Sequence, residues 1–541
     1  MNNDNKKILI EDAKYGAFIA AIAGLLRLIY MRAFLGALPN ALHPSNDARS
    51  YWELSLRIYR DGWLLPNDGP FYQAPLYPYA LSVLHQFGIH SIANMLWLQA
   101  GLGVVNTLLT FVLARSFVSR PAATAAALLF SFSHLVLFLE SKLLAATLGT
   151  TLLLCFALCA MRWLHTRAAH MLAFAGMFYG LTLLCRPNQI FLFPFLVAFF
   201  IWQDRKQKSL LTTPLIFLVA TLIAIAPSFL RNGLVGGDWV PFTANAGVTL
   251  YMGSNPQAQG GLAPIEGLSN DIEDQHTQSI ELASQLAGEA LSPSQASNFW
   301  VKKTIAWAAG NPVSFVILEA KKLLWCLYTA PPAVNVSTHF ETAFISWLWL
   351  LSWPTAFILA LGLIALPLLP RMGDQGWFLL ALFCGYLLLS LTYYASDRFL
   401  AAMAPFFAIQ AMIAVTAYLN SKRSALANDR MRWAIWIALC FVLAFNPFLS
   451  WNTANETGMG YYNLGVFHEE QGELPEAFDA YRNAYEFAPD NSALLLNLGV
   501  LYAKQGDLQR SSRLFERVLK LAPNHPDAMR NLEINRQRMQ Q

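Results

Sequence analysis

Charged residues are scarce in this chain: Asp, Glu, Lys and Arg together make up only 13% of its 541 residues. Hydrophobic residues make up 56%, and the mean hydropathy is +0.39. These values exclude an ordinary soluble globular protein and indicate a polytopic membrane protein. The formal net charge of +4 is too small to form a basic nucleic-acid surface, so we exclude nucleic acid as a partner.

Cysteine is also sparse, and its spacing excludes a zinc site. Cys155 and Cys159 share a helix face, but no polar ligand lies near them in the sequence. All six cysteines lie in or beside apolar segments, where they are expected to be small buried hydrophobic residues. These residues are Cys155, Cys159, Cys185, Cys326, Cys384 and Cys440.

Long apolar runs dominate the chain before residue 452. A spanning helix needs about 20 mostly apolar residues, and eleven segments are candidates, of which the fifth and sixth are short. They are Tyr15–Leu38, Ile92–Val118, Ala122–Leu139, Leu143–Trp163, Met171–Cys185, Ile190–Trp202, Leu210–Leu230, Ser346–Leu369, Trp377–Tyr394, Phe399–Leu419 and Trp433–Trp451. The first segment lacks a small-residue cleavage site, so we expect a retained signal anchor.

The positions of Lys and Arg predict the orientation. With a cytoplasmic N-terminus, fifteen of these residues fall in inner segments and only Lys142, Arg186 and Arg398 fall in short outer loops. The predicted location is therefore a multi-pass protein of the inner (plasma) membrane. Two large loops, at about 39–91 and 231–345, would then face outward. The tail would lie on the same periplasmic or extracytoplasmic side. The inner residues are Lys6, Lys7, Lys14, Arg115, Arg120, Arg162, Arg167, Arg205, Lys206, Lys208, Arg371, Lys422, Arg423, Arg430 and Arg432.

Asp47, in the polar stretch that follows the first span, is the leading catalytic candidate. An acid just outside a membrane helix stays solvated enough to be ionised, yet it can meet the head group of a lipid-borne substrate. The alternative is that Asn46 or Asp47 only caps an interfacial helix from Ala48 to about Arg60, since Asn and Asp are preferred caps. Amphipathic runs in this loop and at about 315–325 predict helices that lie on the membrane face.

The tail after Trp451 is polar and repeats itself with a period of 34 residues. Leu464-Gly465 recurs as Leu498-Gly499, and Tyr481 recurs as Phe515. This is the tetratricopeptide pattern, with two repeats and a final helix from about Pro526 that caps them. Such repeats form concave peptide-binding surfaces, and a scaffold or dimer role is the alternative.

The membrane part resembles the GT-C superfamily of glycosyltransferases. Within it, the chain is similar to the branch of protein O-mannosyltransferases and lipid A aminoarabinose transferase. The match covers about residues 10–420 and depends on several motifs taken in order. They are Asn46-Asp47-Ala48-Arg49 with Ala74-Pro75-Leu76-Tyr77-Pro78, Cys185-Arg186-Pro187-Asn188, Leu230-Arg231-Asn232, Leu250-Tyr251-Met252-Gly253-Ser254-Asn255-Pro256 and Asp397-Arg398-Phe399-Leu400.

The resemblance implies transfer of a sugar, with inversion, from a polyprenyl-phosphate carrier to a hydroxyl of a protein or cell-envelope acceptor. It assigns Asp47 to orient or deprotonate the acceptor, and places Tyr72, Gln73 and Tyr77 among the loop groups that contact substrate. Relatives often carry Glu-Lys before Pro-Pro, whereas this chain has Gln73-Ala74. Because a second carboxylate is thereby missing, we assign no metal ligand and leave a divalent cation open.

The chemistry also calls for cations, because negative charge grows on a departing lipid phosphate. Arg231 and Arg398 are the first choices, since Arg binds phosphate through two nitrogens. Arg186, Lys321 and Lys322 are second choices, and the alternative for the two lysines is that they reach toward lipid head groups. Arg27 lies within the first span, where a charge is costly and by default functional, but the sequence does not reveal its partner.

We therefore expect an all-α protein in two parts. Residues 1–451 form a membrane glycosyltransferase domain of about eleven spans with helices in its outer loops, and residues 452–541 form a tetratricopeptide repeat domain. Two other hypotheses remain: an enzyme of the O-antigen ligase or oligosaccharyltransferase type, and a non-catalytic membrane scaffold that displays the repeat. The expected partners are a polyprenyl-phosphate sugar, its acceptor, the bilayer and a protein bound by the repeat.

Overall fold

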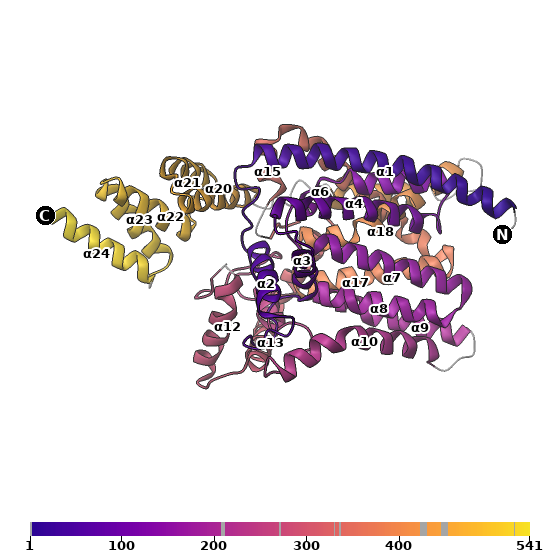
Figure 1. Ribbon diagram of the computed structural model, residues 1–541, viewed down its shortest axis with the longest axis horizontal. Helices are drawn as coiled ribbons and strands as arrows, with labels where there is room; N and C mark the ends of the chain where they lie inside the picture. Colours follow the sequence, from indigo (N-terminus) through magenta and orange to yellow (C-terminus); the bar gives the residue numbers. More distant parts are fainter. Residues whose placement is uncertain are drawn as a thin grey trace. The chain divides into compact units, whose positions relative to one another are not determined.

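The computed structural model describes residues 3–206, 211–269, 272–328, 331–334, 337–421, 430–444, 453–523 and 525–540. Within these ranges every regular element is a helix, so the predicted all-α class is confirmed (Figure 1). The chain divides into two compact units. The first comprises residues 1–33, 46–334 and 347–449, and the second comprises residues 34–45, 335–346 and 450–541.

Seven helical segments in the described ranges are long and apolar enough to cross a membrane. They are contained in α1 (Asn3–Ala37), α4 (Ile92–Ala114), α7 (Ala146–Thr166), α10 (Thr212–Leu234), α16 (Ser352–Ala365) with the flanking 3-10 turns η2 (Ser346–Leu351) and η3 (Leu366–Met372), α17 (Asp374–Thr392) and α18 (Asp397–Ser421). An eighth is a bent pair, α5 (Arg120–Ser131) and α6 (His134–Glu140), with 57° between the two helices.

The three remaining predicted spans coincide with shorter helices. They are α8 (Ala169–Cys185), α9 (Phe193–Lys206), which follows the 3-10 turn η1 (Pro187–Leu192), and α19 (Arg430–Ala444). The end of the last predicted span, from residue 445, lies outside the described residues, as do Lys208, Lys422 and Arg423. Figure 1 shows α4, α7, α8 and α10 side by side, and each packs against its neighbour. These apolar helices make the chain a multi-pass membrane protein.

Helices form in both large loops, and two of them cover the amphipathic runs at about residues 48–60 and 315–325. The first loop contains α2 (Asp47–Asp61) and α3 (Leu76–Gln86). The second contains α11 (Ala246–Gly253), α12 (Ile272–Ala287), α13 (Pro293–Gly310), α14 (Pro312–Cys326) and α15 (Thr338–Phe344). In the first unit, α2, α3, α12 and α13 gather at one end of the long helices (Figure 1). Trp300 of α13 and Tyr72 belong to one buried apolar cluster, which joins the two loops.

The second unit contains the predicted repeats as two helical hairpins and a final helix. These are α20 (Thr453–Glu470) with α21 (Leu474–Phe487), α22 (Ser492–Lys504) with α23 (Leu508–Leu521), and α24 (Pro526–Gln540). A Cβ at Gly465 would lie 2.4 Å from the ring of Tyr481, and one at Gly499 would lie 2.7 Å from the ring of Phe515. Glycine is therefore required where the two helices of each hairpin meet.

A segment from the second membrane loop belongs to the same unit as the repeats. Phe340 and Phe344 of α15 pack on Tyr461 of α20, with ring centroids 5.2 and 6.0 Å away. Gly460 leaves the space for this contact, because a Cβ there would lie 2.3 Å from the ring of Phe340. The first helix of the repeats thus packs against α15, a helix of the second loop.

Candidate active site

Asp47 and Arg398 form an ion pair across 351 positions of sequence. Asp47 is the first residue of α2, Arg398 is the second residue of α18, and Nη1 of the arginine donates to Oδ2 of the aspartate. Their side chains are only 13% and 17% exposed. Nη2 of Arg398 donates to the carbonyl oxygen of Val334 at 3.1 Å. The loop acid and one of the two first-choice cations therefore occupy one largely buried site.

In the described structure, neither oxygen of the Asp47 carboxylate makes a capping bond to α2. Asn46 has a φ of +50° and its side chain makes no capping hydrogen bond to α2. Nε2 of Gln73 donates to Oδ1 of Asp47 at 3.4 Å, and Ser50 Oγ donates to Oε1 of the same glutamine at 2.8 Å. The Asp47 carboxylate thus contacts Arg398 and Gln73. Among the described residues, no group of three or more His, Cys, Asp or Glu side chains gathers as a metal site.

Arg398 is placed by the residues around the beginning of α18. The Asp397 carboxylate accepts from the Arg398 backbone N–H at 2.7 Å and from Ser396 Oγ at 3.0 Å. The Asp397 N–H donates to the carbonyl of Pro332 at 3.2 Å. These bonds tie the first turn of α18 to the second loop, and the guanidinium is thereby held toward Asp47.

Arg186 adds a second cation to this site. It follows α8 directly and is 8% exposed, and its Nη1 is buried without a hydrogen-bond partner. Gly149 of α7 makes room for it, because a Cβ there would lie 2.8 Å from Cδ of the arginine. Burial lowers the pKa of Arg186, and the nearby Arg398 guanidinium lowers it further. Two buried cations repel each other here, which makes the site attractive to an anion.

Tyrosines that are buried or half-buried border the charged groups. Tyr51 of α2 meets Tyr77 edge to face, with centroids 5.5 Å apart, and Tyr77 OH donates to Oε1 of Gln99 at 2.8 Å. Burial, and then the negative charge of Asp47, raise the pKa of Tyr51. Burial raises the pKa of Tyr394, while Arg398 opposes that rise. The phenols therefore stay protonated and are available as hydrogen-bond donors.

The sequence reasoning missed Tyr51 and Tyr394. Tyr51 stands within the polar stretch around Asp47, and Tyr394 lies four residues before Arg398. Proximity to motif residues was the only signal that could have found them.

Arg231 lies apart from this site and its guanidinium is occupied. It donates to four carbonyl oxygens of the turn after α2, and its guanidinium carbon lies 4.4 Å from the centre of the Phe71 ring. The carbonyls belong to Leu64, Leu65, Asp68 and Gly69. Arg231 thus holds the first loop in shape and lies outside the group formed by Asp47, Arg398 and Arg186.

The remaining predicted residues are also bonded within the loops. Lys322 is fully buried and donates to Ser254, Glu319 and the carbonyl of Leu391, so it does not reach toward lipid head groups. Burial lowers its pKa, and Glu319 opposes that shift. Lys321 donates to Gln259 at an exposed position. Tyr72 donates to Gln275 at 3.1 Å and stacks on His276 at 4.5 Å. Of these side chains, none contacts Asp47 in the described structure.

Comparison with known proteins supports the resemblance seen in the motifs. Residues 72–230 match the family model of dolichyl-phosphate-mannose-protein mannosyltransferase, and residues 456–524 match a tetratricopeptide repeat model. No curated protein matches the chain.

Among solved structures, the chain is similar to an oligosaccharyltransferase of Archaeoglobus fulgidus. Its complex with zinc and sulfate has 14% identity and a TM-score of 0.42, over 86% of this chain and 56% of that one. The form tethered to an acceptor peptide with an NVT sequon has 15% identity and a TM-score of 0.41, over 87% and 59%. This chain thus spans less than two thirds of the length of those structures. Residues 72–230 are thus similar to the mannosyltransferase family, and residues 456–524 form a C-terminal tetratricopeptide repeat.

Proposed function

We propose that this protein is a membrane glycosyltransferase that transfers a sugar from a polyprenyl-phosphate carrier to a hydroxyl acceptor with inversion. The observation that carries the proposal is the buried group of Asp47, Arg398 and Arg186, which come from three distant parts of the sequence. The match of residues 72–230 to a family named for a dolichyl-phosphate sugar supports the same donor class.

Arg398 and Arg186 are suited to hold the phosphate of the donor. The bond between the sugar's anomeric carbon and the phosphate oxygen breaks, and its electron pair leaves with the polyprenyl phosphate. Cations already fixed in a site that excludes water stabilise this growing charge without reorganising. Nη1 of Arg186 has no partner inside the protein, so a phosphate oxygen can accept its hydrogen bond without displacing an existing contact.

Asp47 is suited to act on the acceptor. Its carboxylate accepts the acceptor hydroxyl's hydrogen bond and takes up the proton as the oxygen bonds to the anomeric carbon. Inversion requires that the acceptor attacks and the phosphate departs on opposite faces of the sugar. The bound sugar would therefore lie between the Asp47 carboxylate and the phosphate held by the arginines, although Asp47 and Arg398 meet as an ion pair in the free protein. Donor binding would turn Nη1 of Arg398 from Asp47 toward the phosphate, while Nη2 can keep its contact with the carbonyl oxygen of Val334.

A non-catalytic scaffold does not account for this arrangement. A buried ion pair adds little stability over well-packed apolar residues, and a buried arginine without a partner costs stability. A scaffold role supplies no ligand to offset these costs. A site that binds an anion gains from both, because the ligand supplies the missing contacts.

The proposed orientation places this chemistry at the outer face of the inner membrane. It follows from the excess of Lys and Arg in the segments assigned to the cytoplasm. The N-terminus is then cytoplasmic, and the repeat lies outside, on the same side as Asp47. A protein or envelope glycan is the proposed acceptor, and the repeat is proposed to bind a protein.

A panel of carriers tests the function. Purified protein is incubated with polyprenyl-phosphate mannose, glucose, galactose and aminoarabinose, and free polyprenyl phosphate is measured. Release from at least one sugar, with the anomeric configuration inverted in the product, supports the proposal. If the folded protein consumes no member of the panel with any acceptor fraction, the proposal fails.

A further inference from the structure

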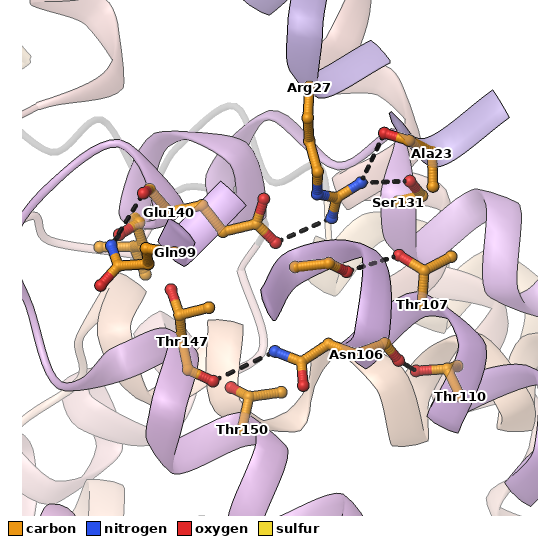
Figure 2. Close-up of polar contacts among 12 residues, drawn as sticks. Ala23, Arg27, Gln99, Asn106, Thr107, Thr110, Ser131, Glu140, Thr147 and Thr150 are labelled. Carbon is orange, nitrogen blue, oxygen red and sulfur yellow. Dashed lines mark hydrogen bonds and ion pairs between the residues drawn. The ribbon is translucent and has the colours of Figure 1, made fainter. Parts of the chain in front are cut away.

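A second buried ion pair lies inside the helix bundle, away from Asp47. Arg27 of α1 and Glu140 at the end of α6 are 2% and 3% exposed, and Nη2 donates to Oε1 at 2.8 Å. Nη1 of the arginine donates to Ser131 Oγ at 2.8 Å (Figure 2). Gly103 of α4 provides the notch, since a Cβ there would lie 2.3 Å from Oε1 of Glu140. The structure thus identifies the partner of the intramembrane arginine.

Beside this pair lies a small cavity with unsatisfied polar atoms. It has a volume of about 20 Å³, and its lining includes Glu140, Asn106 of α4 and Thr147 of α7. Oε2 of Glu140, Oδ1 of Asn106 and Oγ1 of Thr147 are buried without any partner in the protein. Nδ2 of Asn106 donates to the carbonyl of Thr147 at 3.1 Å, which fixes the direction of the amide (Figure 2).

We propose that this cavity binds one water molecule, and that the bound water locks Glu140 in place so that it positions the helix that carries Asp47. A volume of about 10–15 Å³ is enough for one water. Water donates two hydrogen bonds, which match the two acceptors on Glu140 and Asn106. It accepts one, which matches the hydroxyl of Thr147. Three hydrogen bonds are typical of a buried water.

The charge balance favours water over a cation. Arg27 and Glu140 already neutralise each other, so a bound metal ion would leave a net positive charge within the membrane. The rest of the lining is largely apolar and includes Phe130, Val136 and Leu139. A neutral ligand satisfies the three oxygen atoms without that electrostatic cost.

A chain of hydrogen bonds leads from Glu140 toward the candidate active site. The backbone carbonyl of Glu140 accepts from Nε2 of Gln99 at 2.8 Å, and Oε1 of Gln99 accepts from Tyr77 OH at 2.8 Å. Tyr77 packs against Tyr51, one turn along the helix that begins at Asp47. Glu140 is therefore a positioning residue, and this role depends on the proposed function.

Substitution of Thr147 tests both parts of the proposal. Thr147→Val keeps the shape and removes the hydroxyl that donates to the water, whereas Thr147→Ser retains it. Thr110→Val is the matched control, because Thr110 Oγ1 already donates to the backbone carbonyl of Asn106 at 2.7 Å and does not line the cavity. The readouts are density in the cavity of the purified full-length protein, and kcat and KM for the sugar donor.

We expect water density in the wild type and in Thr147→Ser, and about a three- to ten-fold lower kcat with unchanged KM in Thr147→Val alone. An empty cavity, or a sodium-dependent density and activity, would overturn the water site. A kcat of Thr147→Val equal to that of Thr110→Val would overturn the positioning role, even if Thr147→Val unfolds at a lower temperature. If the wild type transfers no sugar, the proposed function fails separately, and the density alone decides the water site.

Discussion

Replacing Arg186 by Met should weaken function while leaving the fold as stable as before or more so. Methionine approximates the apolar stem of arginine, but the guanidinium is lost. In the free protein this group is buried, its Nη1 has no partner, and the Arg398 cation repels it. Removing it therefore relieves an unfavourable interaction in the empty site.

The expected loss of donor affinity follows from the contacts that the phosphate would make. A hydrogen bond to a charged group contributes about 1.5–3 kcal/mol, and 1.36 kcal/mol corresponds to a factor of ten. Loss of one such bond should raise the Kd for polyprenyl phosphate about 10- to 150-fold. Arg186→Lys should fall between the wild type and Arg186→Met, because a single ammonium cannot reproduce the planar guanidinium contact.

Arg231→Met is the matched control. Arg231 is equally buried, at 5% exposed, but it donates to four carbonyl oxygens of the first loop. At about 1 kcal/mol for each bond, this variant should lose roughly 4 kcal/mol of stability. Thermal unfolding in detergent and binding of polyprenyl phosphate give the two measurements. If Arg186→Met lost as much stability as Arg231→Met and bound the carrier like the wild type, the phosphate site would be refuted.

Three further predictions concern the base, the orientation and the tail. Asp47→Asn should stay folded and reduce turnover about 10²- to 10⁴-fold, the usual contribution of a general base. Arg398→Lys should also slow turnover. If either variant released the carrier at the wild-type rate, the role proposed for that residue would be wrong. A phosphatase reporter fused after Trp451 should be active and one after Lys422 inactive, since the Lys and Arg bias places the first outside; the reverse result would remove Asp47 from the outer face. Truncation after Ala454 removes the repeat, and Phe340→Ser with Phe344→Ser replaces the rings that would lose their contact with Tyr461. This variant should transfer sugar to a small acceptor normally but need more protein acceptor for half-maximal rate. If the full-length double-serine variant and the truncated chain used the protein acceptor equally well, recruitment by the repeat would be contradicted.

Much of the fold could be predicted because it depends on local patterns. Each apolar run predicted as a span corresponds to a helix or a bent helix pair in the described residues. Gly465 and Gly499 recur 34 residues apart, and each lies where the paired helix brings a ring against the backbone. A 3.6-residue period and a fixed repeat are properties of neighbouring residues, so one sequence is enough to reveal them.

The candidate site could be predicted only in part, because contacts between distant residues leave no local signal. Asp47 and Arg398 were both found in motifs, but their ion pair could not be inferred. Arg231 had the same residue type and a similar position at a helix end as Arg398, yet its donors bind loop carbonyls. Only the fold distinguishes a guanidinium bound to loop carbonyls from one paired with Asp47.

The position of Glu140 in the sequence could have been used to predict a buried ion pair. It stands just after a predicted apolar span, and an acid at such a position is costly unless it has a partner. Arg27 raised the same question from the first span. The two residues lie 113 positions apart, and pairing the two anomalous charges would have predicted their contact.

We propose that Asp47, Arg398 and Arg186 together act on a polyprenyl-phosphate sugar. The most direct test measures release of polyprenyl phosphate from a labelled donor in one experiment with wild type and Asp47→Asn, together with equilibrium binding of the carrier to both. The wild type should release the carrier as the sugar reaches a hydroxyl, and Asp47→Asn should bind the carrier but release it at least about 100-fold more slowly. Equal rates of carrier release by the two proteins would contradict it.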